Sequence, residues 1–305
     1  MRVGGSPTAF KPPGKQSGIA LVMVLWIMLL VTISTSAYTL MARMDQLEAH
    51  TVMWGTRARM GAEAGVNLAV LALRDPDEMT RWIPDGRSYE LQYNDVRLEI
   101  RVTDERGKLD INSANEVTLQ QLFIGHEMEQ EQANYLAAAM QDWTDSDEIE
   151  RMNGAELETY QGNGLAVGPG NRRFVMVEEI LQVLGMSWEF YQKLEPGLTV
   201  FSEANAPDPA FAPLEALLAL PDMTRDDALN FIEERHSQDA STGLGATLPN
   251  GTVAMARGRG LTYSILAKAT LPNGVWDQVE TTIRLGGSAD GRPFRILRWR
   301  EGFHH

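Results

Sequence analysis

The hydrophobic pattern begins with one long apolar run. Ile19 to Ala42 carries no charged side chain, and a membrane-spanning helix needs about 20 predominantly apolar residues. From Leu47 to Ala72, apolar and small residues recur mostly at three- and four-residue steps, with charged residues between them. The pattern therefore predicts one continuous helix from Ile19 to about Leu73, on the order of 80 Å long at 1.5 Å per residue.

After this helix the period changes from that of a helix to that of a strand. Residues 96–102 alternate apolar and charged side chains, and residues 88–93 are their expected hairpin partner, with Asn94-Asp95 at the turn. Further strands are predicted at 261–271, 275–285 and 294–299. One antiparallel sheet packed on the long helix accounts for these segments.

Helical periodicity fills most of the chain between the second and third strands. We predict an all-α domain at residues 107–241, inserted between strands, with small helical subdomains at about 107–200 and 201–241. Residues 43–106 and 242–305 then form an α/β head. The predicted class is α+β: a long N-terminal helix packed on an antiparallel sheet, with a large all-α insertion.

The polar leader before the apolar run, residues 1–18, contains Arg2, Lys11 and Lys15. Positive charge at this end favours a cytoplasmic leader, with the rest of the chain across the membrane. Three interpretations compete for the run itself: a signal peptide cut after Thr35-Ser36-Ala37, an uncut signal anchor, or cleavage at Gly18. Cleavage at Gly18 leaves residues 19–42 on the mature protein with Ile19 as the new N-terminus. We favour it because the apolar run is long for a signal peptide.

Composition excludes several classes of function. The 305 residues include 27 Lys and Arg against 41 Asp and Glu, a net charge of −14, which repels the phosphate backbone of nucleic acids. The absence of cysteine excludes disulfides, thiolate zinc sites and iron–sulfur clusters. The sequence has no Gly-x-Ser-x-Gly, no phosphate-binding Gly-Lys-Ser/Thr loop and no His-Glu-x-x-His. A non-enzymatic protein is predicted.

An acidic stretch is the strongest candidate for a binding site. Between Asp104 and Glu158 the sequence has 14 acidic and three basic side chains. The Asp-x-Asp spacing of Asp145 and Asp147, with Glu156 after a loop, suits calcium, which takes six to eight oxygen ligands. Asn171 is an outside candidate for a fourth ligand. The alternative is a solvated acidic face with Asp capping a helix.

Two further groups of residues have simple interpretations. We expect five aromatic residues of the insertion to be core: Trp143, Tyr160, Trp188, Phe190 and Tyr191. The C-terminal part of the chain is basic and either steers assembly or forms a charged strand face, through Arg284, Arg292, Arg295, Arg298 and Arg300.

Several stretches, in order, resemble a known family. They are "SGIALVMVLWIMLLVTISTSAYTL", "DERGKLDINSAN", "AAAMQDWTDSDEIERMNGAELETY", "VEEILQVLGMSWEFYQKLEPGLTVF" and "LLALPDMTRDDALNFIEER". They resemble the minor pseudopilin K family of the type II secretion system (general secretion pathway protein K). The resemblance covers most of the chain; each motif is loose, but their order is specific.

The resemblance implies a processing route, a place in the cell and partners. Prepilin peptidase would cut after Gly18 and Ile19 would be N-methylated. The chain would be a single-pass inner-membrane protein with its head in the periplasm, and the insertion would bind calcium. It would join the minor pseudopilins I and J at the pseudopilus tip, meet other pseudopilins and the inner-membrane secretion platform, and control assembly or length for export across the outer membrane.

Met23 departs from the ordinary pilin pattern, in which the fifth residue after the cleavage point is Glu. A carboxylate in hydrocarbon is costly unless it is paired, and in pilins it is thought to pair with the N-terminal amine of the neighbour assembled before it. A subunit at the extreme tip has no such neighbour, so Met23 suits a tip subunit. The alternative is a plain anchor on a periplasmic, calcium-stabilised binding module unrelated to pili.

Overall fold

The computed structural model describes residues 19–237, 245–256, 258–286 and 291–302. The predicted leader, including Gly18, lies outside the described residues. The chain forms two compact units, one ending at Trp54 and the other beginning at Gly55. Each unit is described by itself below.

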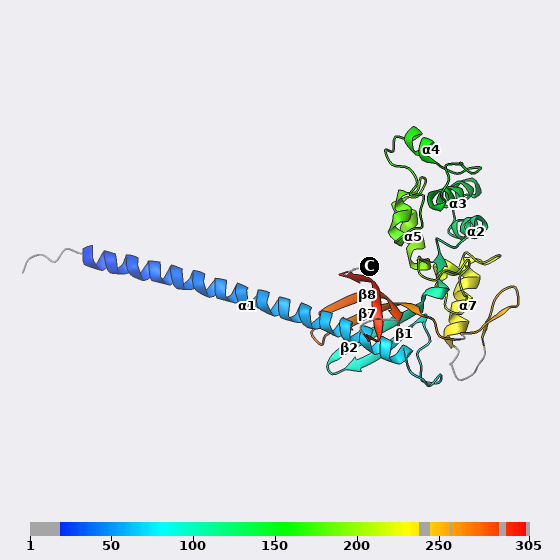
Figure 1. Cartoon of the computed structure of the whole chain (residues 1–305). Coiled ribbons are helices and arrows are strands. Elements are labelled where there is room, and N and C mark those ends of the chain that lie inside the picture. Colours follow the sequence, from blue (N-terminus) through cyan, green and yellow to red (C-terminus); the bar gives the residue numbers. More distant parts are fainter. Residues whose placement is uncertain (1–18, 238–244, 257, 287–290, 303–305) are drawn as a thin grey trace, which may run out of the picture. The chain divides into compact units, whose positions relative to one another are not determined.

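Helix α1 spans Ile19–Leu73 (Figure 1), as the sequence pattern predicts. Its N-terminal part is exposed and contains the apolar run, which reaches a mean hydropathy of 2.4. Three threonines of the run are satisfied inside the helix, because the hydroxyls of Thr32, Thr35 and Thr39 donate to carbonyl oxygens four residues earlier at 2.7–2.8 Å. Among the described residues, α1 is the one helix whose length and composition would allow it to cross a membrane.

The second unit is built on a five-stranded sheet in the order β1-β2-β7-β8-β9. All neighbouring strands are antiparallel. The strands are β1 Asp85–Tyr93, β2 Val96–Asp104, β7 Thr262–Thr270, β8 Trp276–Leu285 and β9 Phe294–Glu301. The predicted antiparallel sheet is confirmed, including the turn between β1 and β2, where Asn94 has a positive φ of 53°.

Small residues bring the C-terminal part of α1 close to the sheet. A Cβ atom at Gly61 would lie 2.9 Å from the Cβ of Ala269, and one at Gly65 would lie 3.1 Å from the Cβ of Ala267. The opposing strand residues are small as well, so helix and sheet interlock at close range. Ile100 of β2 is fully buried and packs beside Gly65.

The chain between β2 and β7 forms the helical insertion. Its helices are α2 Glu116–Gly125, α3 Gln130–Thr144, α4 Leu157–Gly162, α5 Trp188–Leu194, α6 Leu214–Leu217 and α7 Arg225–Ser237, with short 3-10 turns η1 Glu105–Gly107, η2 Val177–Gln182 and η3 Glu195–Gly197. The α+β class with a helical insertion is confirmed. Buried residues form two separate clusters, one around α2, α3 and α5 and the other around α6 and α7.

Two very short strand pairs accompany the insertion. The pair β3 Leu109–Asp110 and β4 Leu198–Thr199 is parallel, and the pair β5 Ala246–Thr247 and β6 Val253–Ala254 is antiparallel. We predicted no strand between 107 and 241, because a two-residue strand is too short to show alternation. The first pair closes the base of the insertion by joining its beginning to a segment about ninety residues later.

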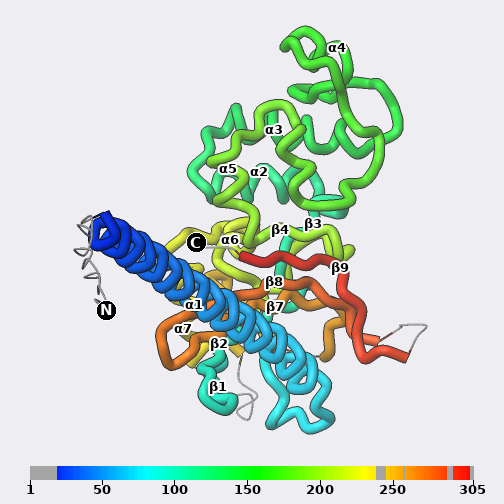
Figure 2. The backbone as a smooth tube through the Cα atoms, turned by 90° about the vertical axis from the view of Figure 1, so that its left-hand side faces the viewer, coloured from blue at the N-terminus to red at the C-terminus, as the bar shows by residue number. Residues whose placement is uncertain are grey.

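Ion pairs join the insertion to the last strand of the sheet, which lies along the side of the sheet nearest the insertion (Figure 2). Arg298 of β9 pairs with Glu178 of η2 and lies 3.3 Å from Glu195. Arg300 lies 2.8 Å from Glu195 and 2.6 Å from Glu280 of β8. Part of the basic C-terminal segment is therefore engaged within the chain.

Candidate functional site

The acidic loop follows helix α3 and leads into α4. Helix α3 forms because Ala133, Leu136, Ala137 and Met140 recur at helical spacing and are buried in the larger cluster of the insertion. The helix ends at Thr144, and Asp145 has an extended backbone. The loop from here to Glu156 thus starts from a rigid, buried helix end.

Asp142, in the last turn of α3, organises the loop. Its carboxylate is fully buried and accepts hydrogen bonds from the backbone N–H of Ala155 at 2.9 Å and from the Arg151 guanidinium at 2.6 Å. A Cβ atom at Gly154 would collide with the same carboxylate, so glycine is required there. Asn153 precedes it with a positive φ of 66°. The loop therefore wraps closely around one buried negative charge.

Three of the four predicted ligands carry buried oxygens without a hydrogen-bond partner. They are Oδ1 of Asp145, both carboxylate oxygens of Glu156, and Oδ1 of Asn171. Leaving such atoms unpaired in a protein interior is costly. Glu156 is only 4% exposed, so its carboxylate is largely removed from bulk solvent. Oxygen atoms left in this way are the kind of donor that a hard cation prefers.

The fourth predicted ligand, Asp147, differs from the other three. It is exposed, and its Oδ1 accepts a hydrogen bond from the backbone N–H of Ile149 at 2.9 Å. Its neighbour Glu148 accepts a hydrogen bond from Nδ2 of Asn171 at 3.0 Å, which joins the two loops that carry the candidate ligands. Among the described residues, no three Asp, Glu or His side chains are grouped as a ready-made metal cluster. The ligand role of Asp147 stays a prediction.

The electrostatics of this loop favour a positive charge. Burial, followed by the negative charges of Asp142 and Asp145, raises the pKa of Glu156 from an ordinary value of 4.5 to about 7. Arg151 supplies one positive charge, and its pKa is raised because it hydrogen-bonds Asp142 and Asp145. That guanidinium does not hydrogen-bond Glu156, whose two oxygens stay unpartnered. A positive charge beside Glu156 would relieve the repulsion among these carboxylates.

Sequence reasoning missed the residues that build this loop. Asp142 lies in the same acidic stretch, three residues before Asp145, but nothing in the sequence separates it from its neighbours. Arg151 was counted only as one of three basic residues, although it bridges Asp142 and Asp145. A lone arginine within an acidic stretch, followed by Asn-Gly, is the signal that could have indicated a folded loop.

The N-terminal candidates lie in α1. Ile19 is the first residue of this helix, and Met23 lies in its first turns as one exposed apolar residue among others. No charged side chain interrupts the helix until Arg43. The structure thus places both residues at the start of an apolar helix suited to hydrocarbon or to a filament core.

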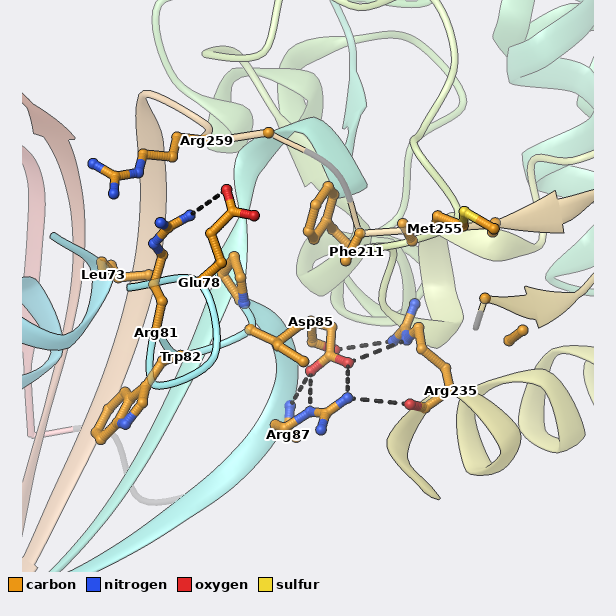
Figure 3. A pocket seen from close by; sticks show the side chains of 18 of the residues that line it. Leu73, Glu78, Arg81, Trp82, Asp85, Arg87, Phe211, Arg235, Met255 and Arg259 are labelled. Atoms are coloured by element: carbon orange, nitrogen blue, oxygen red, sulfur yellow. Dashed lines mark hydrogen bonds and ion pairs between the residues drawn. The ribbon is translucent and has the colours of Figure 1, made fainter. Parts of the chain in front are cut away.

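A second cluster of charges lines a cavity of about 380 Å³ beside α7 and the start of β1 (Figure 3). At its base, the buried carboxylate of Asp85 accepts hydrogen bonds from Nε and Nη2 of Arg87 at 2.9 and 2.8 Å. Arg235 of α7 donates to the backbone oxygens of Asp85, Pro209 and Ala212 at 2.8–2.9 Å. Nε of Arg235 has no hydrogen-bond partner but lies 3.6 Å from Oδ2 of Asp85, so an ion pair and backbone hydrogen bonds join α7 to the sheet.

The fold and these sites define a pilin-like protein: a long N-terminal helix that begins with an apolar run, an antiparallel sheet on its C-terminal part, and a helical insertion with an acidic loop. The model of the family "Type II secretion system (T2SS), protein K" matches residues 96–203. Type II secretion system protein K of Klebsiella pneumoniae is 29% identical over 256 residues, which cover 75% of this chain and 77% of the relative. The protein of the same name from Dickeya chrysanthemi is 32% identical over 124 residues, covering 39% of this chain and 34% of the relative.

A solved structure shares the fold. A chain in the crystal structure of the GspK-GspI-GspJ complex from the enterotoxigenic Escherichia coli type 2 secretion system matches with a TM-score of 0.53 and 14% identity. The match covers 86% of this chain and 99% of the other. These similarities to type II secretion system protein K support a minor pseudopilin role in type II secretion for this chain.

Proposed function

We propose that this minor pseudopilin occupies the tip of the pseudopilus, where it controls assembly or length and so serves protein export across the outer membrane. Before assembly it would be an inner-membrane protein with a single span, α1, and a periplasmic head. Prepilin peptidase would cut after Gly18, leaving Ile19 as an N-methylated terminus. The platform in the inner membrane would then move it into the filament with other pseudopilins.

The observation that carries the tip position is Met23 in the apolar run of α1. A subunit with a neighbour ahead of it benefits from a carboxylate at this position, whereas a first subunit would carry an unpaired charge in hydrocarbon. The helical insertion is a second support, because it adds bulk to the head that a further subunit would have to pass. The solved complex that shares the fold names GspI and GspJ, so the partners proposed here are the minor pseudopilins I and J.

A substitution at Met23 tests the tip position. We expect Met23→Glu to reduce incorporation into pseudopili, and thus secretion, about tenfold or more, because a tip subunit would carry an unpaired carboxylate in an apolar environment. Met23→Leu is the matched apolar control and should secrete as the natural chain does. The measurement is the amount of exported protein and of this chain in sheared pseudopili. Normal secretion by Met23→Glu would contradict a tip position.

The partner proposal has its own test. The full chain, co-expressed with minor pseudopilins I and J and solubilised in mild detergent, should co-purify with both in fixed ratio. A major pseudopilin expressed in their place is the control, and we expect less of it to be retained. Equal retention of all pseudopilins would contradict a specific tip complex.

We also propose that the acidic loop of the insertion binds calcium. Glu156, Asp145 and Asn171 would hold the ion through their unpartnered oxygens, with Asp147 as a further expected ligand. The ion would supply the positive charge that the loop lacks near Glu156. Asp142 and Arg151 would hold the loop in place without being ligands themselves, because their polar atoms already bind each other.

A further inference from the structure

Exposed apolar side chains gather at α4 and the two loops beside it. Ile149 is 76% exposed, Met152 87% and Val167 73%, and Leu157 and Leu165 are each more than 40% exposed. We call these five residues the distal patch, because α4 lies at the end of the insertion farthest from the sheet (Figures 1 and 2). A soluble surface seldom exposes this many large apolar side chains together without a binding role.

The five residues form one surface because their segments are tied together. The first loop is joined to α4, since the Thr159 hydroxyl donates to the Glu150 carboxylate. The second loop returns onto α4, since the backbone N–H of Leu165 donates to the Tyr160 carbonyl at 3.0 Å. Further along this loop, a Cβ atom at Gly168 would lie only 2.7 Å from Cδ1 of Leu157.

The distal patch rests on a rigid support. Tyr160 of α4 is 1% exposed, and its hydroxyl accepts a hydrogen bond from the backbone N–H of Leu184 at 3.0 Å. The Tyr160 ring lies 6.1 Å from that of Trp143, which is also buried. A surface held in place before binding loses less conformational entropy when a partner docks.

The chain segment that carries the distal patch is strongly acidic. Between Asp145 and Gly168 the sequence contains a single basic residue, Arg151, and its guanidinium is paired with Asp142 and Asp145. Glu150 and Glu158 are exposed carboxylates that each follow an apolar residue of the patch, Ile149 and Leu157. An acidic border repels the anionic headgroups of a membrane surface. It attracts a protein surface that carries lysine or arginine.

We propose that the distal patch docks a protein partner whose contact surface combines apolar side chains with lysine or arginine. The apolar side chains of both surfaces leave water on contact, while the opposite charges at the border set orientation and speed of association. This role is separate from the position of the chain in the pseudopilus. Ile149 and Met152 lie in the acidic loop, so the distal patch borders the proposed calcium site, and it assigns to the far end of the insertion a function that α1 does not perform.

The test is site-specific photo-cross-linking of the full chain in secreting cells. A photo-cross-linking residue is placed in turn at positions 149, 152 and 167, and mass spectrometry identifies the cross-linked peptide of the partner. We expect all three positions to capture the same partner, through a segment that contains apolar residues and lysine or arginine. Position 192 on α5, which is exposed but outside the patch, is the control and should not capture that partner.

Substitutions separate the apolar and the charged contributions. With the cross-linker at 167, Met152→Ser and Glu158→Lys should each lower the yield about tenfold, while Glu189→Lys on α5 should leave it unchanged. Both patch residues are exposed, so the variants should keep the protease resistance of the natural chain, which is measured in parallel. Cross-links to lipid, to a second copy of the chain or to an acidic segment, or no cross-link at all, would overturn the proposal.

Discussion

Asp85 and Glu156 are both buried carboxylates, but only Asp85 is hydrogen-bonded by a positively charged side chain. Asp85 is 2% exposed and is held by two hydrogen bonds from Arg87, with Nε of Arg235 3.6 Å away. Glu156 is 4% exposed, and neither of its oxygens has a partner. The two residues have almost the same burial, so the difference lies in the groups around them.

A buried charge is tolerated when a partner balances it. At Asp85 the chain supplies the hydrogen-bond partner itself through Arg87, and Arg235 of α7 adds a second positive charge 3.6 Å away that links β1 to α7. At Glu156 burial, followed by the negative charges of other carboxylates, raises the pKa to about 7. The carboxylate of Glu156 lacks such a partner and can be balanced by a cation from solution. We therefore place calcium beside Glu156 and not beside Asp85.

The largest expected effect is the loss of Arg235. Removing one partner of a buried ion pair costs about 3–5 kcal/mol, and Arg235→Ala also leaves the carbonyls of Pro209 and Ala212 without a donor. Chemical unfolding of the detergent-solubilised chain, followed by near-ultraviolet circular dichroism, measures the free energy. Arg225→Ala, at an exposed position of the same helix, is the control and should change it by less than about 0.5 kcal/mol. Equal costs for the two variants would contradict a buried link.

The second largest expected effect concerns Glu156. Without calcium, its substitution should raise the free energy of unfolding, whereas loss of Arg235 lowers it. Glu156→Gln removes a buried negative charge from among other carboxylates, so we expect the free energy of unfolding at neutral pH to rise by about 1 kcal/mol in a chelator. In calcium the same variant should bind the ion about 10- to 100-fold more weakly, as measured by isothermal titration calorimetry. Glu158→Gln, exposed and two residues further on, is the matched control. Unchanged calcium affinity in Glu156→Gln would remove this residue from the ligand set.

The third expected effect is a dependence of folding stability on pH that comes from Glu156. Because the pKa of Glu156 is raised from 4.5 to about 7, the folded chain holds a proton that the unfolded chain has already lost. Without calcium, stability is therefore highest below pH 4.5 with respect to this group, and it falls as pH rises through about 7. Calcium affinity should rise over the same interval and level off above it.

Glu156→Gln provides the control for the pH experiment. The variant lacks the titrating group, so its stability in chelator should change less than that of the natural chain between pH 4.5 and about 7. Parallel curves for the natural chain and the variant would show that another group is responsible.

The smallest expected effect lies at the link between the insertion and β9. Arg298 and its partners Glu178 and Glu195 are partly exposed, and ion pairs of this kind contribute about 0.2–1 kcal/mol. Arg298→Gln should lower the free energy of unfolding by no more than about 1 kcal/mol, and the difference should shrink at high salt. A loss as large as that of Arg235→Ala would show that this link behaves like the buried one.

The sequence predicted the parts of the fold that repeat a local pattern. Helix α1 ends at Leu73 and the main strands begin and end within a few residues of their predicted limits, because each has a clear period and a turn residue at its end. Trp188 was expected in the core but is 55% exposed. An aromatic residue at the start of a short helix gives no indication of which side it faces.

The links between distant segments could not be predicted. Arg235 meets Asp85, and Arg298 meets Glu178, across more than a hundred residues, and nothing in a single sequence joins one charge to another at that separation. In the acidic loop, composition and spacing predicted a cation site with Glu156 and Asp145 among its ligands. The sequence could not show that the Asp142 carboxylate is hydrogen-bonded by Arg151, because that contact depends on how the loop folds around Gly154.

Sequencing of the mature N-terminus tests most sharply whether the apolar helix is retained after the leader is removed. The full chain is purified from secreting cells and its N-terminal peptide is sequenced by mass spectrometry. The account predicts a peptide that begins with N-methylated Ile19, and an uncut chain when prepilin peptidase is inactivated. A chain that begins with Met1 in secreting cells, or one cut after Ala37, would contradict it.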